Sequence, residues 1–171
     1  AGTRAVAGTG LDAGNVSTLR VRWRFPLTTK PNFSGTFSST PVADGDTIYV
    51  QDLGSNVFAL DRATGAVRWS KRFNASNDGP NGLAVAGGRI YGATDDDAFS
   101  LSESTGKELW HRHLTSAQEQ FVNDAPVPWK GLVFLSTIGY APRGRGAIYA
   151  LDAATGAVRW KFVTIAKPWP H

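Results

Sequence analysis

Hydrophobic and polar positions alternate over short runs along most of the chain, which is the pattern of half-buried β-strands. The runs come in groups of four, separated by turns rich in Gly, Pro, Asn and Asp. No window carries a 3.6-residue period. The pattern therefore predicts an all-β fold of four-stranded antiparallel units. The strands are expected at 39–43, 46–51, 56–61 and 66–73, at 82–86, 89–93, 97–102 and 107–113, and at 124–128, 131–136, 146–152 and 157–164.

The last two strands of each unit share one motif, apolar–aromatic–small–Leu–Asp/Ser–x–x–Thr–Gly–x–x–x–Trp. Its copies are Val57–Trp69, Ala98–Trp110 and Ile148–Trp160. Trp23 holds the closing position in a shorter leading segment, and successive Trp residues are 46, 41 and 50 apart. This period matches the blades of a β-propeller, about 40–50 residues each. Residues 1–171 are therefore predicted to form a partial propeller, with an entry strand at 19–25 and three blades at about 37–73, 78–114 and 122–165.

The Thr-Gly pair of the motif has a mechanical explanation. The chain must reverse between the third and fourth strands of each blade. Asp61 or Asp152 can accept hydrogen bonds from backbone N–H groups two or three residues on, and Ser102 does so more weakly. The following Gly can take a positive φ and complete the turn. The closing Trp is expected to pack into the next blade.

The number of blades predicts a partner. Propellers close with about 4–8 blades, so three leave two open blade faces lined with apolar side chains. We therefore expect the chain to be part of a larger ring. The ring is completed either by another propeller segment or by a copy of the chain itself. The sequence begins with Ala1 rather than Met, which predicts a processed piece of a larger protein.

Composition and charge narrow the function classes. The chain is 42% hydrophobic, 11% aromatic and 19% charged, which excludes a disordered tail. No apolar run reaches the roughly 18 residues of a membrane span. Arg20, Arg22 and Arg24 account for part of the +4 net charge, but they follow simple strand alternation, so no nucleic-acid partner is expected. The absence of Cys excludes disulfides and Cys-ligated metals.

The repeated motif resembles the docking motif of the pyrroloquinoline quinone (PQQ) dehydrogenase-like propellers, Ala-x-Asp-x-x-Thr-Gly-x-x-x-Trp. The second copy departs from it with Ser100 and Ser102. The resemblance runs from about Asn15 to Ile165 and implies a propeller fold in a periplasmic or secreted protein. In alcohol-oxidising members of this family, PQQ lies on the propeller axis beside a metal ion such as Ca²⁺.

The resemblance also gives positions to compare. The dehydrogenases have a Glu where this chain has Ser38, an Arg where it has Asn81, and Thr-Gly where it has Asn123-Asp124. Their metal-binding Glu matches no carboxylate in Gly139–Pro142. No cofactor is therefore evident in this chain, and only the resemblance implies PQQ with Ca²⁺. Asn81, Asn123 and Asp124 are the candidate cofactor-binding residues; the alternative is that they simply solvate the end of the channel.

Two other clusters are weaker candidates. Asp95–Asp97 is expected to be a hairpin turn rather than a Ca²⁺ site. His111 and His113 point the same way on an outer strand with no evident third ligand, so no metal site is expected.

Two functions stay open, and the sequence does not decide whether the protein is an enzyme. One is an extracytoplasmic binding or scaffold module. The other is the N-terminal part of a PQQ-dependent alcohol or polyol dehydrogenase whose catalytic residues lie in blades absent here.

Overall fold

A computed structural model describes residues 10–27, 39–77, 82–115, 120–139 and 145–164. Within these residues the fold is all-β, with one short 3-10 helix at Val16–Thr18. The strands form three antiparallel sheets, so the all-β prediction of four-stranded units is confirmed. None of the helical structure described is long and apolar enough to cross a membrane.

The three sheets follow one another along the chain. The first contains β1 (Val42–Asp44), β2 (Thr47–Gln51), β3 (Val57–Asp61) and β4 (Val67–Lys71). The second contains β5 (Ala84–Ala86), β6 (Arg89–Ala93), β7 (Asp97–Ser102) and β8 (Glu108–His113). The third contains β10 (Val127–Trp129), β11 (Leu132–Gly139), β12 (Ala147–Asp152) and β13 (Val158–Val163). In each sheet these four strands are neighbours in chain order.

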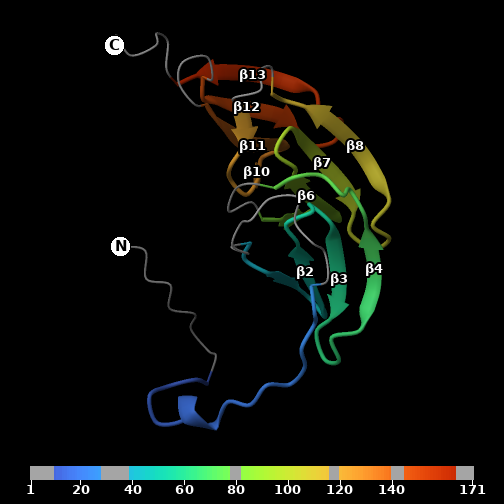
Figure 1. The fold of residues 1–171 in the computed structure, drawn as a ribbon, viewed down its shortest axis with the longest axis vertical. Coiled ribbons are helices and arrows are strands. Elements are labelled where there is room, and N and C mark those ends of the chain that lie inside the picture. The colour runs from blue at the N-terminus through green and yellow to red at the C-terminus, as the bar shows by residue number, and fades with distance from the viewer. Residues whose placement is uncertain (1–9, 28–38, 78–81, 116–119, 140–144, 165–171) are drawn as a thin grey trace.

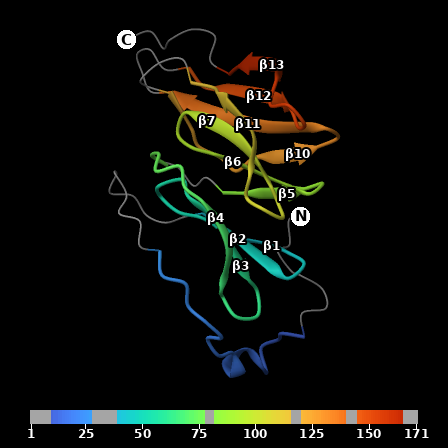
Figure 2. The same ribbon diagram turned by 90° about the vertical axis from the view of Figure 1, so that its right-hand side faces the viewer.

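The sheets fan out around one side of the molecule, as propeller blades do. Their outermost strands β4, β8 and β13 lie along the convex edge in Figure 1, and Figure 2 shows the sheets stacked in chain order. Each sheet carries the same irregularity, a register shift after Ala59, Ser100 or Ala150 in its third strand. The repeat is therefore structural as well as sequential, and we call the sheets blades 1, 2 and 3.

The third blade has one strand that the sequence pattern did not predict. Strand β9 (Gln120–Val122) pairs with the far end of β11 in the register Thr137–Val122. Val122 also donates from its backbone N–H to Asp95 O at 2.7 Å, which ties β9 to blade 2. The predicted strands of the third blade begin at residue 124, so they leave β9 out.

The hydrophobic core lies between the blades. One cluster of buried residues fills the space between blades 1 and 2, with Tyr49, Ala59, Ile90 and Phe99 among its members. A second cluster does the same between blades 2 and 3 and includes Trp110. Each blade is thus stabilised by its neighbours, because a single sheet has no second layer of its own to bury its faces against.

The segment predicted as an entry strand over 19–25 is extended but forms no strand ladder. No described strand lies beside it to provide hydrogen-bond partners. It is held by side chains instead: Trp23, Phe25 and Leu27 pack against the cluster containing Phe58 and Leu60 of blade 1. The Phe25 and Phe58 rings meet edge to face at 5.2 Å.

Candidate functional site

The residues that precede the innermost strands converge at one end of the blades. A Cβ added at Gly82, before β5, would lie 3.5 Å from the Cβ of Ala125 and 3.8 Å from Ser39 Oγ. Ser39 and Ala125 precede β1 and β10, the innermost strands of blades 1 and 3. Innermost strands surround the axis of a propeller, so these residues mark its axial end.

Two buried oxygens near this end, Ser39 Oγ and Asn123 Oδ1, have no hydrogen-bond partner among the described residues. Asn123 follows β9 directly and stands two residues before Ala125. The amide oxygen can only accept a hydrogen bond, so it suits a donor supplied by water or a ligand. That Asn123 binds a cofactor stays a prediction. Asn81, the first of the three candidates, lies outside the described residues.

Asp124, the third candidate, has a structural partner. Its carboxylate accepts hydrogen bonds from Ser136 N at 3.0 and 3.1 Å and from Ser136 Oγ at 2.8 Å. Burial raises the pKa of Asp124 above its ordinary value, and the bonds from Ser136 only partly offset that rise. The side chain therefore fixes the start of the blade to β11, and whether it also touches a ligand stays a prediction.

The described candidate residues at this end bring no cation toward a quinone. The carboxylates of the quinone suit Arg, Thr and backbone donors. The described residues gathered here offer a hydroxyl at Ser39, an amide at Asn123 and a carboxylate at Asp124, and two of their oxygens lack a donor of their own. Ser39 Oγ and Asn123 Oδ1 can each accept a hydrogen bond from a ligand or from water.

The structure supplies the partner that the two histidines lacked in the sequence. Asp97 Oδ1 lies 2.8 Å from His113 Nδ1, and Asp97 Oδ2 lies 3.3 Å from His111 Nε2. Asp97 is paired opposite His113 in the sheet, a register that spacing alone does not reveal. No group of three His, Cys, Asp or Glu suited to a metal ion occurs in the described part of the chain.

The aspartate triplet forms a turn, as predicted. Thr94 Oγ1 accepts hydrogen bonds from the backbone N–H groups of Asp96 and Asp97 at 3.2 and 3.0 Å. Asp96 Oδ1 in turn accepts a hydrogen bond from Thr115 Oγ1 at 2.7 Å. The triplet therefore joins β6 to β7 and anchors the segment that leaves blade 2.

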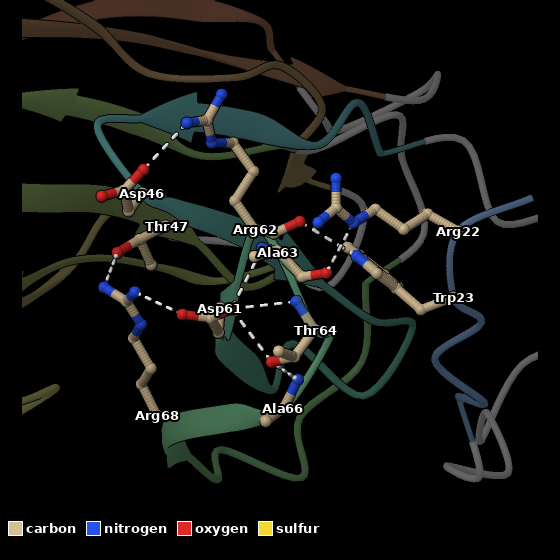
Figure 3. Close-up of polar contacts among 10 residues, drawn as sticks. All are labelled: Arg22, Trp23, Asp46, Thr47, Asp61, Arg62, Ala63, Thr64, Ala66 and Arg68. Carbon is tan, nitrogen blue, oxygen red and sulfur yellow. Dashed lines mark hydrogen bonds and ion pairs between the residues drawn. The ribbon is translucent and has the colours of Figure 1, made fainter.

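The turns that join the third and fourth strands of blades 1 and 3 have the predicted mechanism, which Figure 3 shows for blade 1. In blade 2, Ser102 Oγ instead lies 3.2 Å from Ser104 Oγ, and none of the described backbone N–H groups donates to it. Asp61 Oδ1 accepts hydrogen bonds from the backbone N–H groups of Ala63 and Thr64 at 3.0 and 2.9 Å and from Thr64 Oγ1 at 2.9 Å. Arg68 Nη2 donates to Asp61 Oδ2 at 2.6 Å. This guanidinium and the Thr64 bonds hold the pKa of Asp61 well below its usual range.

Each of these turns receives the Trp of the blade or segment before it. The indole Nε1–H donates to a turn carbonyl in three cases: Trp23 to Arg62 O at 3.0 Å, Trp69 to Glu103 O at 2.9 Å and Trp110 to Ala153 O at 3.0 Å. The ring covers the turn glycine so closely that a Cβ on Gly65, Gly106 or Gly156 would lie 2.5–2.6 Å from it. These glycines have φ values of 75°, 70° and 69°.

The fourth Trp of the series has nothing to dock on in the described structure. Trp160 on β13 is 45% exposed, against 8% for Trp110. Its ring packs on Phe134 at 5.8 Å, and Phe134 packs on the exposed Trp129 at 6.5 Å. Phe162, two residues along the same strand, is 61% exposed. We call Trp129, Phe134, Trp160 and Phe162 the open face.

Three blades of one topology, linked by the same Trp-to-turn contact, define a propeller of the PQQ-repeat class. A family model described as outer membrane protein assembly factor BamB matches residues 11–168, so the chain belongs to this family. The predicted resemblance to PQQ dehydrogenase-like propellers is thereby confirmed. The quinohemoprotein alcohol dehydrogenase ADH IIB of Pseudomonas putida is 31% identical to 94% of this chain, which covers 25% of that protein. The enzyme of Comamonas testosteroni is 31% identical over 91% of the chain and 23% of its own length.

Solved structures agree on the fold. A europium-containing methanol dehydrogenase superposes with a TM-score of 0.76 at 26% identity, covering 90% of this chain and 28% of its own. BamB from Moraxella catarrhalis superposes with a TM-score of 0.56 at 23% identity, covering 75% and 38%, and shows the fold alone. The chain spans about a quarter of the length of the curated relatives it matches.

Proposed function

We propose that the chain supplies consecutive blades of an extracytoplasmic propeller and acts in it as a binding or scaffold unit. The open face is the observation that carries this proposal. It repeats the geometry by which Trp69 and Trp110 dock on the next blade, and it leaves Trp160 exposed. Exposed apolar area of this kind marks an interaction surface. The family description, an outer membrane assembly factor, supports a location outside the cytoplasm.

The partner of the open face is a further propeller segment with an uncovered Thr-Gly turn. Within this chain the turns at Gly106 and Gly156 are covered by Trp69 and Trp110, and that at Gly65 is covered by Trp23. Arg22 Nε reinforces that last contact by donating to Ala63 O at 2.8 Å (Figure 3). A second copy would have to displace the leading segment before its Trp160 could reach Gly65. The observations therefore favour another segment over a copy of the chain.

Binding rather than catalysis suits the residues at the axial end. Asn123 and Asp124 stand where the dehydrogenases have Thr-Gly. Ser39 Oγ and Asn123 Oδ1 have no hydrogen-bond partner among the described residues. These groups can orient a polar ligand or a partner's side chains. They bring no cation toward the carboxylates of a quinone.

The second candidate is the N-terminal part of a PQQ-dependent alcohol dehydrogenase. The identity to quinohemoprotein alcohol dehydrogenases over most of the chain favours it. In that case the remaining blades would supply the metal ligands and the catalytic base, and this chain would contribute one wall of the site.

Addition of PQQ and Ca²⁺ to the complete propeller, in which the further segment is joined to this chain, separates the two candidates. The scaffold proposal predicts that no quinone absorbance stays with the protein through gel filtration and that no dye is reduced when alcohol is added. Retained quinone together with alcohol-dependent dye reduction would overturn it and establish the dehydrogenase.

A further inference from the structure

A cavity of about 410 Å³ lies at the junction of blades 1 and 2. Blade 1 contributes strands β2 and β4 to its wall, and blade 2 contributes its two turns. The lining residues are Thr47, Tyr49, Arg68, Trp69, Gly88, Glu103 and Ser104. The volume is within the range that holds small molecules, roughly 300–1,000 Å³. The cavity lies away from the axial end, because the β5–β6 and β7–β8 turns that line it are at the opposite end of blade 2 from the residues that precede β5.

Negative charge in this cavity lacks a cation. Glu103 forms no ion pair with any described residue; Tyr49 OH lies 3.2 Å from its Oε1, and the Asp44 side chain is within hydrogen-bond reach of the same carboxyl group. Burial raises the pKa of Glu103, and the nearby carboxylate of Asp44 on blade 1 raises it further. Two carboxylates from adjoining blades thus face one another, an arrangement that a cation would stabilise.

The one cation in the wall is already engaged. Arg68 Nη1 donates to Thr47 Oγ1 at 2.8 Å, and its Nη2 donates to Asp61 Oδ2 at 2.6 Å (Figure 3). The guanidinium is thereby held against the turn of blade 1. Its charge is balanced by Asp61, so the charge of Glu103 and Asp44 is left over.

The junction of blades 2 and 3 shows which residues the docking of one blade on the next requires. At the junction of blades 2 and 3, Tyr91 replaces Tyr49 and its OH donates to Ala153 O at 3.3 Å. Ala153 stands where Glu103 stands, and Ala86 stands where Asp44 stands. That junction docks its Trp with the same geometry and carries neither carboxylate. The two carboxylates are therefore not required for docking.

A protonated amine fits this cavity better than a metal ion does. Ca²⁺ requires six to eight oxygen ligands, and the described residues contain no group of three acidic or His side chains suited to a metal. A primary ammonium carries three donors and one charge on an apolar stem. The rings of Tyr49 and Trp69, 5.9 Å apart and tilted by 39°, form the apolar part of the wall, and aromatic walls also attract cations.

We propose that the cavity between blades 1 and 2 binds a primary ammonium group, with Glu103 as its counter-ion, Asp44 adding to the negative potential, and Trp69 and Tyr49 covering the alkyl stem. The ammonium belongs to a free amine or to a lysine side chain of another protein. The site does not depend on the axial end, so it stands or falls separately from the proposed function.

The indole N–H of Trp69 is the reporter for the test, because it donates to Glu103 O at 2.9 Å. The indole N–H of Trp110 is the internal control at the junction without carboxylates. Titration with n-butylammonium chloride at constant ionic strength, followed by ¹⁵N–¹H NMR, is expected to shift the Trp69 signal saturably and leave the Trp110 signal in place. n-Butanol, of similar shape and without charge, is expected to shift neither.

Variants identify the counter-ion. Glu103→Gln and Glu103→Ala are expected to weaken n-butylammonium binding about tenfold or more. The alanine variant has a natural precedent in Ala153, so the blade tolerates it. Glu108→Gln removes a carboxylate that pairs with Lys71 at 3.0 Å elsewhere on the blades and is expected to leave binding unchanged.

The remaining arms decide the source of the ammonium. Tighter binding of N-acetyl-lysine amide than of n-butylammonium supports a protein side chain, and the reverse order supports a free amine. The proposal is wrong if neither amine shifts Trp69 at millimolar concentration or if Glu103→Gln binds as the wild type does. It is also wrong if CaCl₂ alone produces the shift that the amines fail to produce.

Discussion

The docking contact between blades can be tested with two substitutions of the same residue type. Trp110→Ala removes a side chain that is 8% exposed and donates to Ala153 O across the junction. Trp160→Ala removes one that is 45% exposed and packs only within its own blade in the described structure. The chemistry deleted is identical, so any difference in stability reports docking.

The magnitudes follow from burial. Truncation of a buried Trp to Ala costs about 3–5 kcal/mol of unfolding free energy, including the cavity left behind. A half-exposed ring leaves much less apolar area to return to water, so Trp160→Ala is expected to cost about 1–2 kcal/mol. For a chain of this size, Trp110→Ala should lower the Tm by about 10 °C and Trp160→Ala by a few degrees.

Urea unfolding followed by far-UV circular dichroism is the appropriate assay, because it does not depend on the fluorescence of the Trp that is removed. Dilute protein keeps the open face free of self-association, and repetition at two concentrations checks this. Equal losses in the two variants would refute the claim that Trp110 docks on blade 3 while Trp160 has no acceptor within the described structure.

Three further predictions follow from the turns and the axial end. Gly106→Ala puts a Cβ 2.5 Å from Trp69, whereas Gly131→Ala meets nothing within 4 Å at a similar positive φ; thermal unfolding should show a loss of about 1–2 kcal/mol for Gly131→Ala and a clearly larger one for Gly106→Ala, and equal losses would contradict the ring contact. The hydrogen bond from Arg159, and to a lesser extent that from Thr155, lowers the pKa of Asp152 to about 2. The stability that this carboxylate adds is therefore complete above its ordinary pKa and is lost as the pH falls toward 2. The unfolding free energy of Asp152→Asn should fall less steeply with acid than that of the wild type, and an equal fall would contradict this role of the carboxylate. Burial raises the pKa of Asp124, so ionisation of this side chain reduces the stability of the fold as the pH rises. In urea unfolding, the stability of Asp124→Asn relative to wild type should therefore improve from pH 4 to pH 8. A difference that does not vary with pH would count against the burial of this charge.

The strands and turns could be predicted because their causes are local. The alternation over 89–93 and 97–102 predicts the bounds of β6 and β7, and the Asp and Gly of the turns in blades 1 and 3 need no distant partner. The leading segment was harder. Its alternation is strand-like, but a strand ladder requires a neighbour, and none of the described strands provides one.

The candidate sites could not be predicted as well from the sequence, because their contacts join different blades or strands. Glu103 meets Tyr49 across 54 residues of sequence, and Trp110 meets Ala153 across 43. The pairing of Asp97 with both histidines follows from sheet register. Comparison of Glu103 with Ala153 between repeats would have marked the extra carboxylate, since a position that varies among equivalent docking turns is free to serve another purpose.

The central claim is that the open face completes a larger ring. Light scattering after gel filtration tests whether the open face is the interaction surface that this claim requires. The isolated chain lacks the further segment that would cover its open face, and exposed apolar surface of this kind self-associates. We therefore expect the 171-residue chain alone to have a mass above 18.3 kDa that rises with concentration, and we expect Trp160→Glu to return it toward the monomer. A stable, monodisperse monomer of 18.3 kDa at every concentration, with Trp160 still exposed, would contradict the account.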